Sequence, residues 1–197
     1  MNRLIVITGA SGAGKTTLAN ALVKKGKFDL VLEQHIERPF QALFKQNPKY
    51  ALANQLDYLI VRAEQEYQLR QGSIPALMDG GLDLDFHGFT RLFHKHGWLN
   101  DAEFDLCKRF YLLTRSLLPP PDLIINVSAS RQIISERLAT RNRINIASSE
   151  DAEFLSQYLE EWLETIPKEK ILRLDISHEE MNYANSVQII KKRVGEI

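Results

Sequence analysis

A glycine-rich segment near the start of the chain carries the clearest chemical signal. Residues 9–16 read GASGAGKT, which matches the phosphate-binding pattern G-x-x-x-x-G-K-[ST]. In such a loop the backbone N–H groups point inward and, together with the start of the following helix, surround a polyphosphate. The pattern predicts that Lys15 contacts the β- and γ-phosphates and that the Thr16 hydroxyl binds Mg²⁺. The predicted nucleoside triphosphate site consists of Gly9, Ala10, Ser11, Gly12, Ala13, Gly14, Lys15, Thr16 and Thr17.

A carboxylate at the end of an apolar run is the second candidate metal ligand. Asp79 follows residues 74–78, which read IPALM and are typical of a buried strand. An acid at this place in a phosphate-loop protein lies close to the metal, so we expect Thr16 and Asp79 to share the ion. No N-K-x-D-like segment that reads guanine is present, which argues against a GTPase. The loop by itself does not decide between a kinase and other classes of nucleotide-binding protein.

Polar residues on the second strand and on a long helix indicate a second binding site. Glu33 follows the strand predicted at residues 29–32. Gln55 and Arg62 are seven residues apart in a helical pattern, so they share one face two turns apart. Ligands of parallel sheets bind beyond the carboxyl ends of the strands. We therefore expect Glu33, Gln55 and Arg62 to lie near one another.

Short apolar runs alternate with longer amphipathic ones along the whole chain. The predicted strands are residues 4–8, 29–32, 74–78, 123–127 and 171–174, and the predicted helices are residues 16–25, 50–71, 86–96, 101–118, 130–140, a segment after Ser149 and 183–194. Such alternation predicts an α/β fold with a five-stranded parallel sheet and helices on both faces. No repeat or linker interrupts it, so one domain over residues 1–197 is expected.

Composition limits the classes of partner. The chain has 197 residues, of which 44% are apolar, as in ordinary globular proteins. Lys plus Arg and Asp plus Glu are both 25, and this balance argues against a protein that binds nucleic acid through excess positive charge. No apolar run reaches the ~18 residues that span a bilayer, and no secretory signal is visible. We expect a cytoplasmic protein without membrane partners, whose lone Cys107 is a small buried side chain.

The order of these motifs resembles the deoxynucleoside kinase family over most of the chain. That family carries a phosphate loop, a Glu in an E-P-x-x-x-N-P-like segment, a Gln and an Arg seven residues apart, two acids six residues apart and an arginine-rich lid. The matching residues here are Glu33 in the segment that ends at Pro39, then Gln55, Arg62, Asp79, Asp85, and the lid arginines Arg137, Arg141 and Arg143. The resemblance implies a P-loop kinase fold that acts as a homodimer, with residues 86–96 and 101–118 as candidate contacts.

The resemblance also implies a reaction, the transfer of the γ-phosphoryl group of ATP or another triphosphate to the 5′-hydroxyl of a nucleoside, with Mg²⁺. Glu33 is then the general base, while Lys15, Arg137, Arg141 and Arg143 offset charge on the phosphates. Gln55 and Asp85 read the base, with Arg62 nearby. The implied substrate-binding residues are Glu33, Phe44, Gln55, Arg62, Asp79 and Asp85.

The sequence departs from the family pattern around the sugar of the acceptor and in the lid, where Ile146 stands in place of the family's acid. Gly80 and Gly81 stand where the family has Arg and Ser, and Phe44 stands where it has a Tyr. Phosphorylation can survive this loss, especially where Arg91, Arg109 or Arg115 moves in. If the pocket is otherwise intact, Gly80→Arg is expected to improve turnover of deoxynucleosides. Two alternatives stay open: a P-loop kinase for a nucleotide or a non-nucleoside alcohol, and a nucleotide-binding protein with little turnover.

Overall fold

The computed structural model describes residues 2–32, 38–139 and 149–196, with residues 138, 139, 149 and 150 described by their backbone alone. Five parallel strands form one sheet in the order β2-β3-β1-β4-β5. The strands are β1 (Leu4–Thr8), β2 (Asp29–Val31), β3 (Ala76–Asp79), β4 (Leu123–Ser128) and β5 (Ile171–Asp175). The predicted α/β fold with a five-stranded parallel sheet is confirmed.

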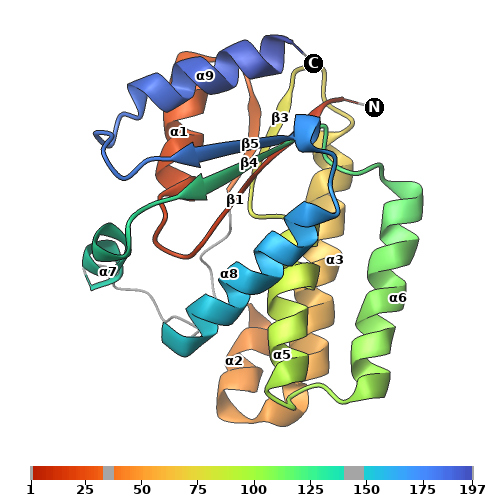
Figure 1. Cartoon of the computed structure of the whole chain (residues 1–197). Coiled ribbons are helices and arrows are strands. Elements are labelled where there is room, and N and C mark those ends of the chain that lie inside the picture. Colours follow the sequence, from red (N-terminus) through yellow and green to blue (C-terminus); the bar gives the residue numbers. More distant parts are fainter. Residues whose placement is uncertain (1, 33–37, 140–148, 197) are drawn as a thin grey trace.

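Helices cover both faces of this sheet (Figure 1). They are α1 (Lys15–Lys25), α2 (Pro39–Gln46), α3 (Ala51–Leu69), α4 (Leu82–Leu84), α5 (Arg91–Lys95), α6 (Asp101–Leu117), α7 (Arg131–Ala139), α8 (Ser149–Glu164) and α9 (Ala184–Gly195). Short helical turns lie at η1 (Pro48–Tyr50) and η3 (Lys168–Lys170), and η2 (Asp85–Thr90) is a π-helical segment. Within the described ranges, no helix is long and apolar enough to cross a membrane.

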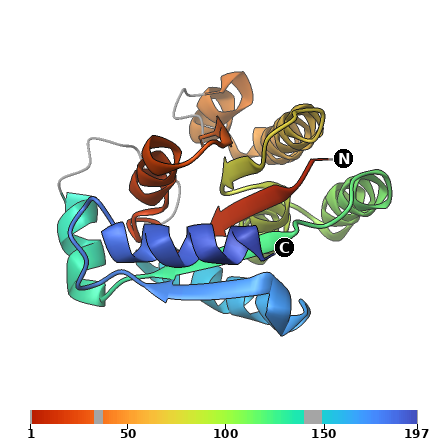
Figure 2. The same cartoon turned by 90° about the horizontal axis from the view of Figure 1, so that it is seen from above.

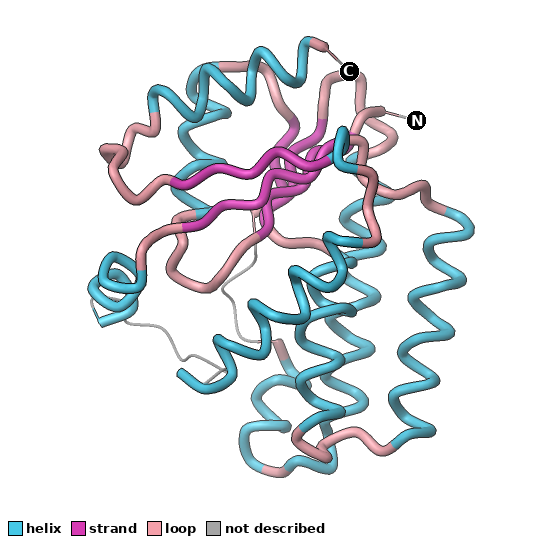
Figure 3. Tube along the Cα trace, in the orientation of Figure 1, coloured by secondary structure: helices cyan, strands magenta, loops and turns pink. Residues whose placement is uncertain are grey.

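The sheet separates two apolar layers. On β1, Ile5 and Ile7 face the layer formed with α1 and α9, while Leu4 and Val6 face the layer that includes Leu69 of α3. This alternation follows from the pleat of a strand, whose successive side chains point to opposite faces. Figure 2 shows α1 and α9 side by side on one face, and Figure 3 shows the strands as one layer between helical segments.

Helices α2, α3, α5 and α6 extend beyond the sheet (Figure 1), and their side chains form a separate apolar cluster. Helix α6 begins as predicted, because the Asn100 side chain accepts from the backbone N–H of Glu103 and the Glu103 carboxylate accepts from that of Asn100. Helix α2 is absent from the sequence-based prediction. Phe40, Leu43 and Phe44 stand at helical spacing, but the helix has only eight residues and buries Phe44 alone, so its periodic pattern is short.

Candidate active site

The phosphate-binding loop lies between β1 and α1, as its sequence predicts. Gly9 has φ +137°, and a Cβ there would lie 2.2 Å from the backbone oxygen of Val127 on β4. Only glycine therefore permits the chain to leave β1 so close to its neighbour. Helix α1 begins directly after the loop at Lys15, so its first N–H groups lie beside the loop, as an anion site requires.

Two cations contact the loop. The Lys15 ammonium donates to the backbone oxygens of Gly9 at 3.0 Å and Ala10 at 3.1 Å. The guanidinium of Arg137, from α7, donates to the backbone oxygen of Ala13 at 2.9 Å. The first predicted lid arginine is thus beside the loop, whereas the two later lid arginines, Arg141 and Arg143, lie outside the described residues.

Thr16 and Asp79 meet at the end of the sheet. Parallel pairing places Asp79 of β3 beside Ile7 of β1, one residue before the strand ends and the loop begins. The Thr16 hydroxyl donates to Oδ2 of Asp79 at 2.5 Å, and Asp79 is fully buried. A hydroxyl and a carboxylate are hard oxygen ligands of the kind that Mg²⁺ uses together with substrate phosphates and water. No group of three or more His, Cys, Asp or Glu side chains suited to a metal occurs within the described ranges.

The predicted base-reading residues also come together, although α3 and η2 are separate in sequence. Arg62 donates through Nε to Oδ2 of Asp85 at 2.9 Å, and both side chains are buried. The Thr90 hydroxyl lies 3.1 Å from Oε1 of Gln55. The face of α3 that carries Gln55 and Arg62 is therefore one polar surface against η2. Glu33 lies outside the described residues, so its predicted place as the base is not tested.

Three comparisons with known proteins fit this geometry. The family model for deoxynucleoside kinase matches residues 5–197. The chain belongs to the deoxynucleoside kinase family. It is 33% identical over 141 residues to a deoxyadenosine kinase of Dictyostelium discoideum, an alignment that covers 71% of this chain and 57% of the relative. It is 28% identical over 145 residues to a deoxyguanosine kinase of Bacillus subtilis (strain 168), covering 71% of this chain and 67% of the relative.

A solved structure shares the fold of this family member. Deoxyadenosine kinase from M. mycoides, solved with the products dCMP and a flexible dCDP bound, superposes with a TM-score of 0.80 over 98% of this chain and 100% of that chain, at 21% identity. The likeness confirms the P-loop kinase fold. Family membership confirms the predicted class, a phosphotransferase that phosphorylates nucleosides with a nucleotide donor.

The position where the family pattern has an arginine is occupied by a glycine in a turn that a residue with a side chain would adopt only with strain. Gly80 has φ +77°, and a Cβ at this position would lie 3.4 Å from Nη2 of Arg62. Of the three arginines expected to replace the lost one, Arg115 is bound elsewhere, by Glu66 and Asp83. The guanidinium beside Gly80 is that of Arg62, which the resemblance places near the base-reading residues.

The other two candidates do not fill that place either. Arg91 pairs with Glu161 at 2.6 Å and lies over the ring of Tyr158, while Arg109 is exposed on α6. Arg91 and Arg115 are thus already paired with carboxylates, and the idea that one of the three arginines moves in stays a prediction. Nothing in the one-dimensional pattern shows which long side chain is already paired.

Phe44 lies in an aromatic cluster between helices. Its ring centroid is 4.8 Å from that of Phe93 and 5.2 Å from that of Trp98, and the residue is buried. The absent hydroxyl is thus replaced by apolar packing of α2 against α5. Whether the ring also touches the acceptor stays a prediction.

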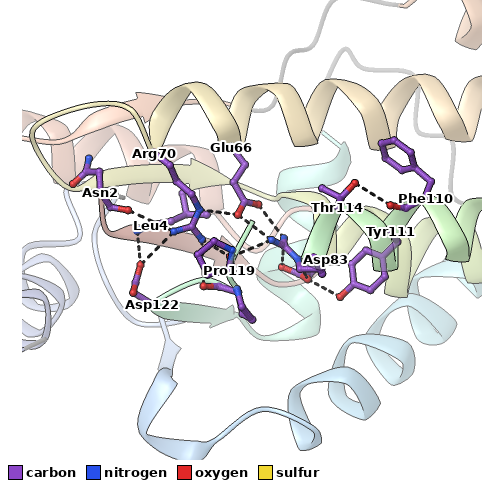
Figure 4. Close-up of polar contacts among 12 residues, drawn as sticks. Asn2, Leu4, Glu66, Arg70, Asp83, Phe110, Tyr111, Thr114, Pro119 and Asp122 are labelled. Carbon is purple, nitrogen blue, oxygen red and sulfur yellow. Dashed lines mark hydrogen bonds and ion pairs between the residues drawn. The ribbon is translucent and has the colours of Figure 1, made fainter. Parts of the chain in front are cut away.

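A buried ionic network that sequence reasoning missed holds α6 against α3 and α4 (Figure 4). The Arg115 guanidinium bonds both oxygens of Glu66, each at 2.9 Å, and both oxygens of Asp83, at 2.9 and 2.8 Å. The Tyr111 hydroxyl donates to Asp83 at 2.8 Å. Burial, followed by the charge of Asp83, raises the pKa of Tyr111. The network fixes the segment that follows Gly80 and Gly81.

His87 extends this network toward α8. Its Nε2 lies 3.1 Å from the Tyr111 hydroxyl, and its ring stacks on Trp162 with centroids 5.6 Å apart. Burial lowers the pKa of His87 to about 4, so the imidazole is neutral at pH 7. Cys107 is fully buried, which confirms the predicted small buried side chain, and burial raises its pKa to about 11.

Tyr183 is another residue beside the phosphate loop that the sequence pattern does not predict. It lies directly before α9, its φ is +47°, and its side chain is fully buried. A Cβ on Gly14 would lie 2.7 Å from the Tyr183 hydroxyl and 3.0 Å from Nη1 of Arg137. The phosphate loop therefore rests on a residue from the far end of the chain, and only the three-dimensional structure brings them together.

Proposed function

We propose that this protein transfers the γ-phosphoryl group of ATP, or of another nucleoside triphosphate, to the 5′-hydroxyl of a nucleoside or deoxynucleoside. The observation that best supports this proposal is that two candidate binding sites lie at the same end of the sheet. The phosphate loop and the contact between Thr16 and Asp79 form the donor site, and the buried pair of Arg62 and Asp85 on α3 and η2 forms the acceptor site. The family match over residues 5–197 supports the same reaction.

In this proposal the nucleoside oxygen attacks the γ-phosphorus, the bond to the bridging oxygen breaks, and the nucleoside diphosphate leaves. The acceptor proton passes to Glu33. Lys15, with Arg137, Arg141 and Arg143, stabilises the charge that the transferred group shares with the leaving phosphate. Gln55 and Asp85 orient the base, and positioning accounts for most of the rate because phosphoryl transfer needs little covalent chemistry from the protein.

Mg²⁺ is the proposed metal, with Thr16 and Asp79 as its residues. When bound, the ion neutralises charge on the β- and γ-phosphates. The oxygen donor set at this point, described above, supports the choice of a hard cation.

A homodimer is part of the proposal. Helix α6 exposes the apolar side chains of Leu106, Leu112, Leu113 and Leu117. The first three line a shallow surface pocket together with Arg109 and Phe110. Exposed apolar patches of this kind are typical of association sites. The other predicted contact, residues 86–96, buries Phe86, Leu92 and Phe93 within the chain and offers less apolar surface. Analytical ultracentrifugation checks the dimer, and a monomer at micromolar concentration contradicts it.

We also propose that the enzyme is cytoplasmic.

The test is a reaction with ATP, Mg²⁺ and a panel of nucleosides, nucleotides and simple alcohols, followed by mass spectrometry. A nucleoside monophosphate as product supports the proposal, while a product only from another acceptor, or no product, contradicts it.

Lys15→Ala is expected to remove thermal stabilisation by ATP, because the loop loses its phosphate-binding cation. Glu33→Gln is expected to abolish turnover and to spare ATP binding, and a near-normal rate in this variant would show that another group takes the proton.

A further inference from the structure

A fully buried asparagine lies next to the acceptor cluster. Asn54 directly precedes Gln55 on α3, and its side chain is 0% exposed. Neither the nitrogen nor the oxygen of its amide makes a hydrogen bond to any residue of the described part of the chain. Buried amides in folded proteins are almost always partnered, because an unmade hydrogen bond in the interior is destabilising. Asn54 therefore lacks the hydrogen-bonding partner that a buried amide needs within the described part of the chain.

Helix geometry places Asn54 on the face of α3 that borders a small cavity. This cavity is lined by Tyr58, Val61, Arg62 and Gln65 of α3 and by Arg38. Side chains four, seven, eight and eleven residues apart share one face of a helix, and these are the intervals from Asn54 to those four residues. Asn54 thus continues the cavity-lining stripe by one turn toward the start of α3, beside Gln55.

The neighbouring polar groups already have partners within the protein. Gln55 bonds the Thr90 hydroxyl, and Arg62 bonds Asp85 and, at 3.3 Å, the side-chain oxygen of Gln65. On this face, the amide of Asn54 differs in that neither its Nδ2 donor nor its Oδ1 acceptor has a protein partner within the described ranges. An amide matches groups that present a donor and an acceptor side by side, as the edges of nucleobases do.

We propose that Asn54 determines acceptor specificity by hydrogen bonding to the base of the nucleoside. The proposal rests on the function proposed above and adds a second amide, beside Gln55, to the base-reading site. A site built to hydrogen-bond its ligand rejects analogues that lack the matching group, because its own polar atoms are then left unpaired. Asn54 thereby contributes to the choice among bases.

The test compares Asn54→Leu with the parent, since leucine keeps the approximate volume and removes both hydrogen-bonding groups. Initial rates are measured for deoxyadenosine, deoxyguanosine, deoxycytidine and thymidine, with ATP and Mg²⁺. We expect the KM of the preferred nucleoside to rise about 10- to 100-fold, with kcat less affected, as befits the loss of one or two hydrogen bonds. The preference among the four bases should shrink, and the KM of ATP should stay within twofold. Removing the unpaired amide should leave the melting temperature of the ligand-free protein unchanged or raise it by a few degrees.

Thr114→Val is the matched control. This residue is also a buried polar side chain on a helix, but its hydroxyl donates to the backbone oxygen of Phe110 on α6. It should change stability without changing any nucleoside KM. The inference would be overturned by an Asn54→Leu enzyme that is more stable but keeps the parental KM values and base preference. That result would show that the unpaired amide only lowers stability. A parent that neither phosphorylates nor binds any of the four nucleosides would instead overturn the proposed function itself.

Discussion

Replacing Arg115 with methionine tests whether the buried network positions α6 and the segment after β3. Methionine fills similar space without charge, so it leaves the carboxylates of Glu66 and Asp83 without their shared cation. Glu66 keeps Arg70 at 3.0 Å, and Asp83 keeps the Tyr111 hydroxyl. Burial lowers the pKa of Arg115, but the charge of Asp83 and the contacts with Glu66 outweigh it, so the pKa lies above its ordinary value. The guanidinium is thus charged whenever the protein is folded.

The expected loss is large because both carboxylates are buried. Removing one partner of a buried ion pair costs about 3–5 kcal/mol of unfolding free energy. For a chain of this length, that corresponds to a fall in melting temperature of about 6–20 °C. The matched control is Arg173→Met, whose partner Glu160 is at 2.8 Å but where both side chains are about half exposed. Exposed pairs contribute at most about 1 kcal/mol, so this variant should melt within about 4 °C of the parent.

Thermal and urea unfolding at pH 8 and pH 5 give the decisive readout. An unpaired buried carboxylate is neutralised when it takes up a proton, so the folded variant binds more protons than its unfolded chain. Stability then falls as pH rises, and the loss caused by Arg115→Met should be larger at pH 8 than at pH 5. A loss below about 1 kcal/mol, or one that is equal at the two pH values, would refute the reasoning.

Two other predictions concern neighbouring positions. Because burial holds the pKa of His87 at about 4 against an ordinary 6.5, the stability from its neutral form is complete above pH 6.5 and is lost as pH falls toward 4. This loss is about 2 kcal/mol between pH 7 and pH 5, and urea titration of His87→Phe should show it abolished; a parallel pH dependence in variant and parent would contradict it. Gly80→Arg should lower the unfolding free energy by about 1–2 kcal/mol, because φ is +77° there, and should not improve turnover as the family pattern alone predicts. A more active variant of parental stability would restore that expectation.

The parts of this fold that were predictable are those encoded locally. Residues 9–16 need only their own glycines and the adjoining strand and helix, and the meeting of Thr16 with Asp79 follows once both strands are placed in a parallel sheet. The one-domain organisation stays a prediction, supported by a family match that runs from residue 5 to residue 197.

The parts that were not predictable depend on contacts distant in sequence. Arg115 is 49 residues from Glu66 and 32 from Asp83, and no periodicity marks which arginine joins them. The positive φ of Gly80 is equally invisible in a pattern that records only the loss of an arginine. The order and spacing of motifs therefore identified candidate functional residues, but which of them pair with one another could be seen only in the three-dimensional structure.

The way charges are paired at the two sites also bears on the nature of the acceptor. Lys15 is held by two neutral backbone oxygens, so its charge is available to an incoming phosphate at small cost. Arg62 is bound to a buried carboxylate, and separating that pair would leave Asp85 as an uncompensated buried charge. An anionic acceptor at the α3 surface would have to break this pair, whereas an uncharged one can bond to it intact. The electrostatics thus favour a nucleoside over a nucleotide as the acceptor, because of these two cations it is Lys15, in the donor loop, that is held by neutral groups.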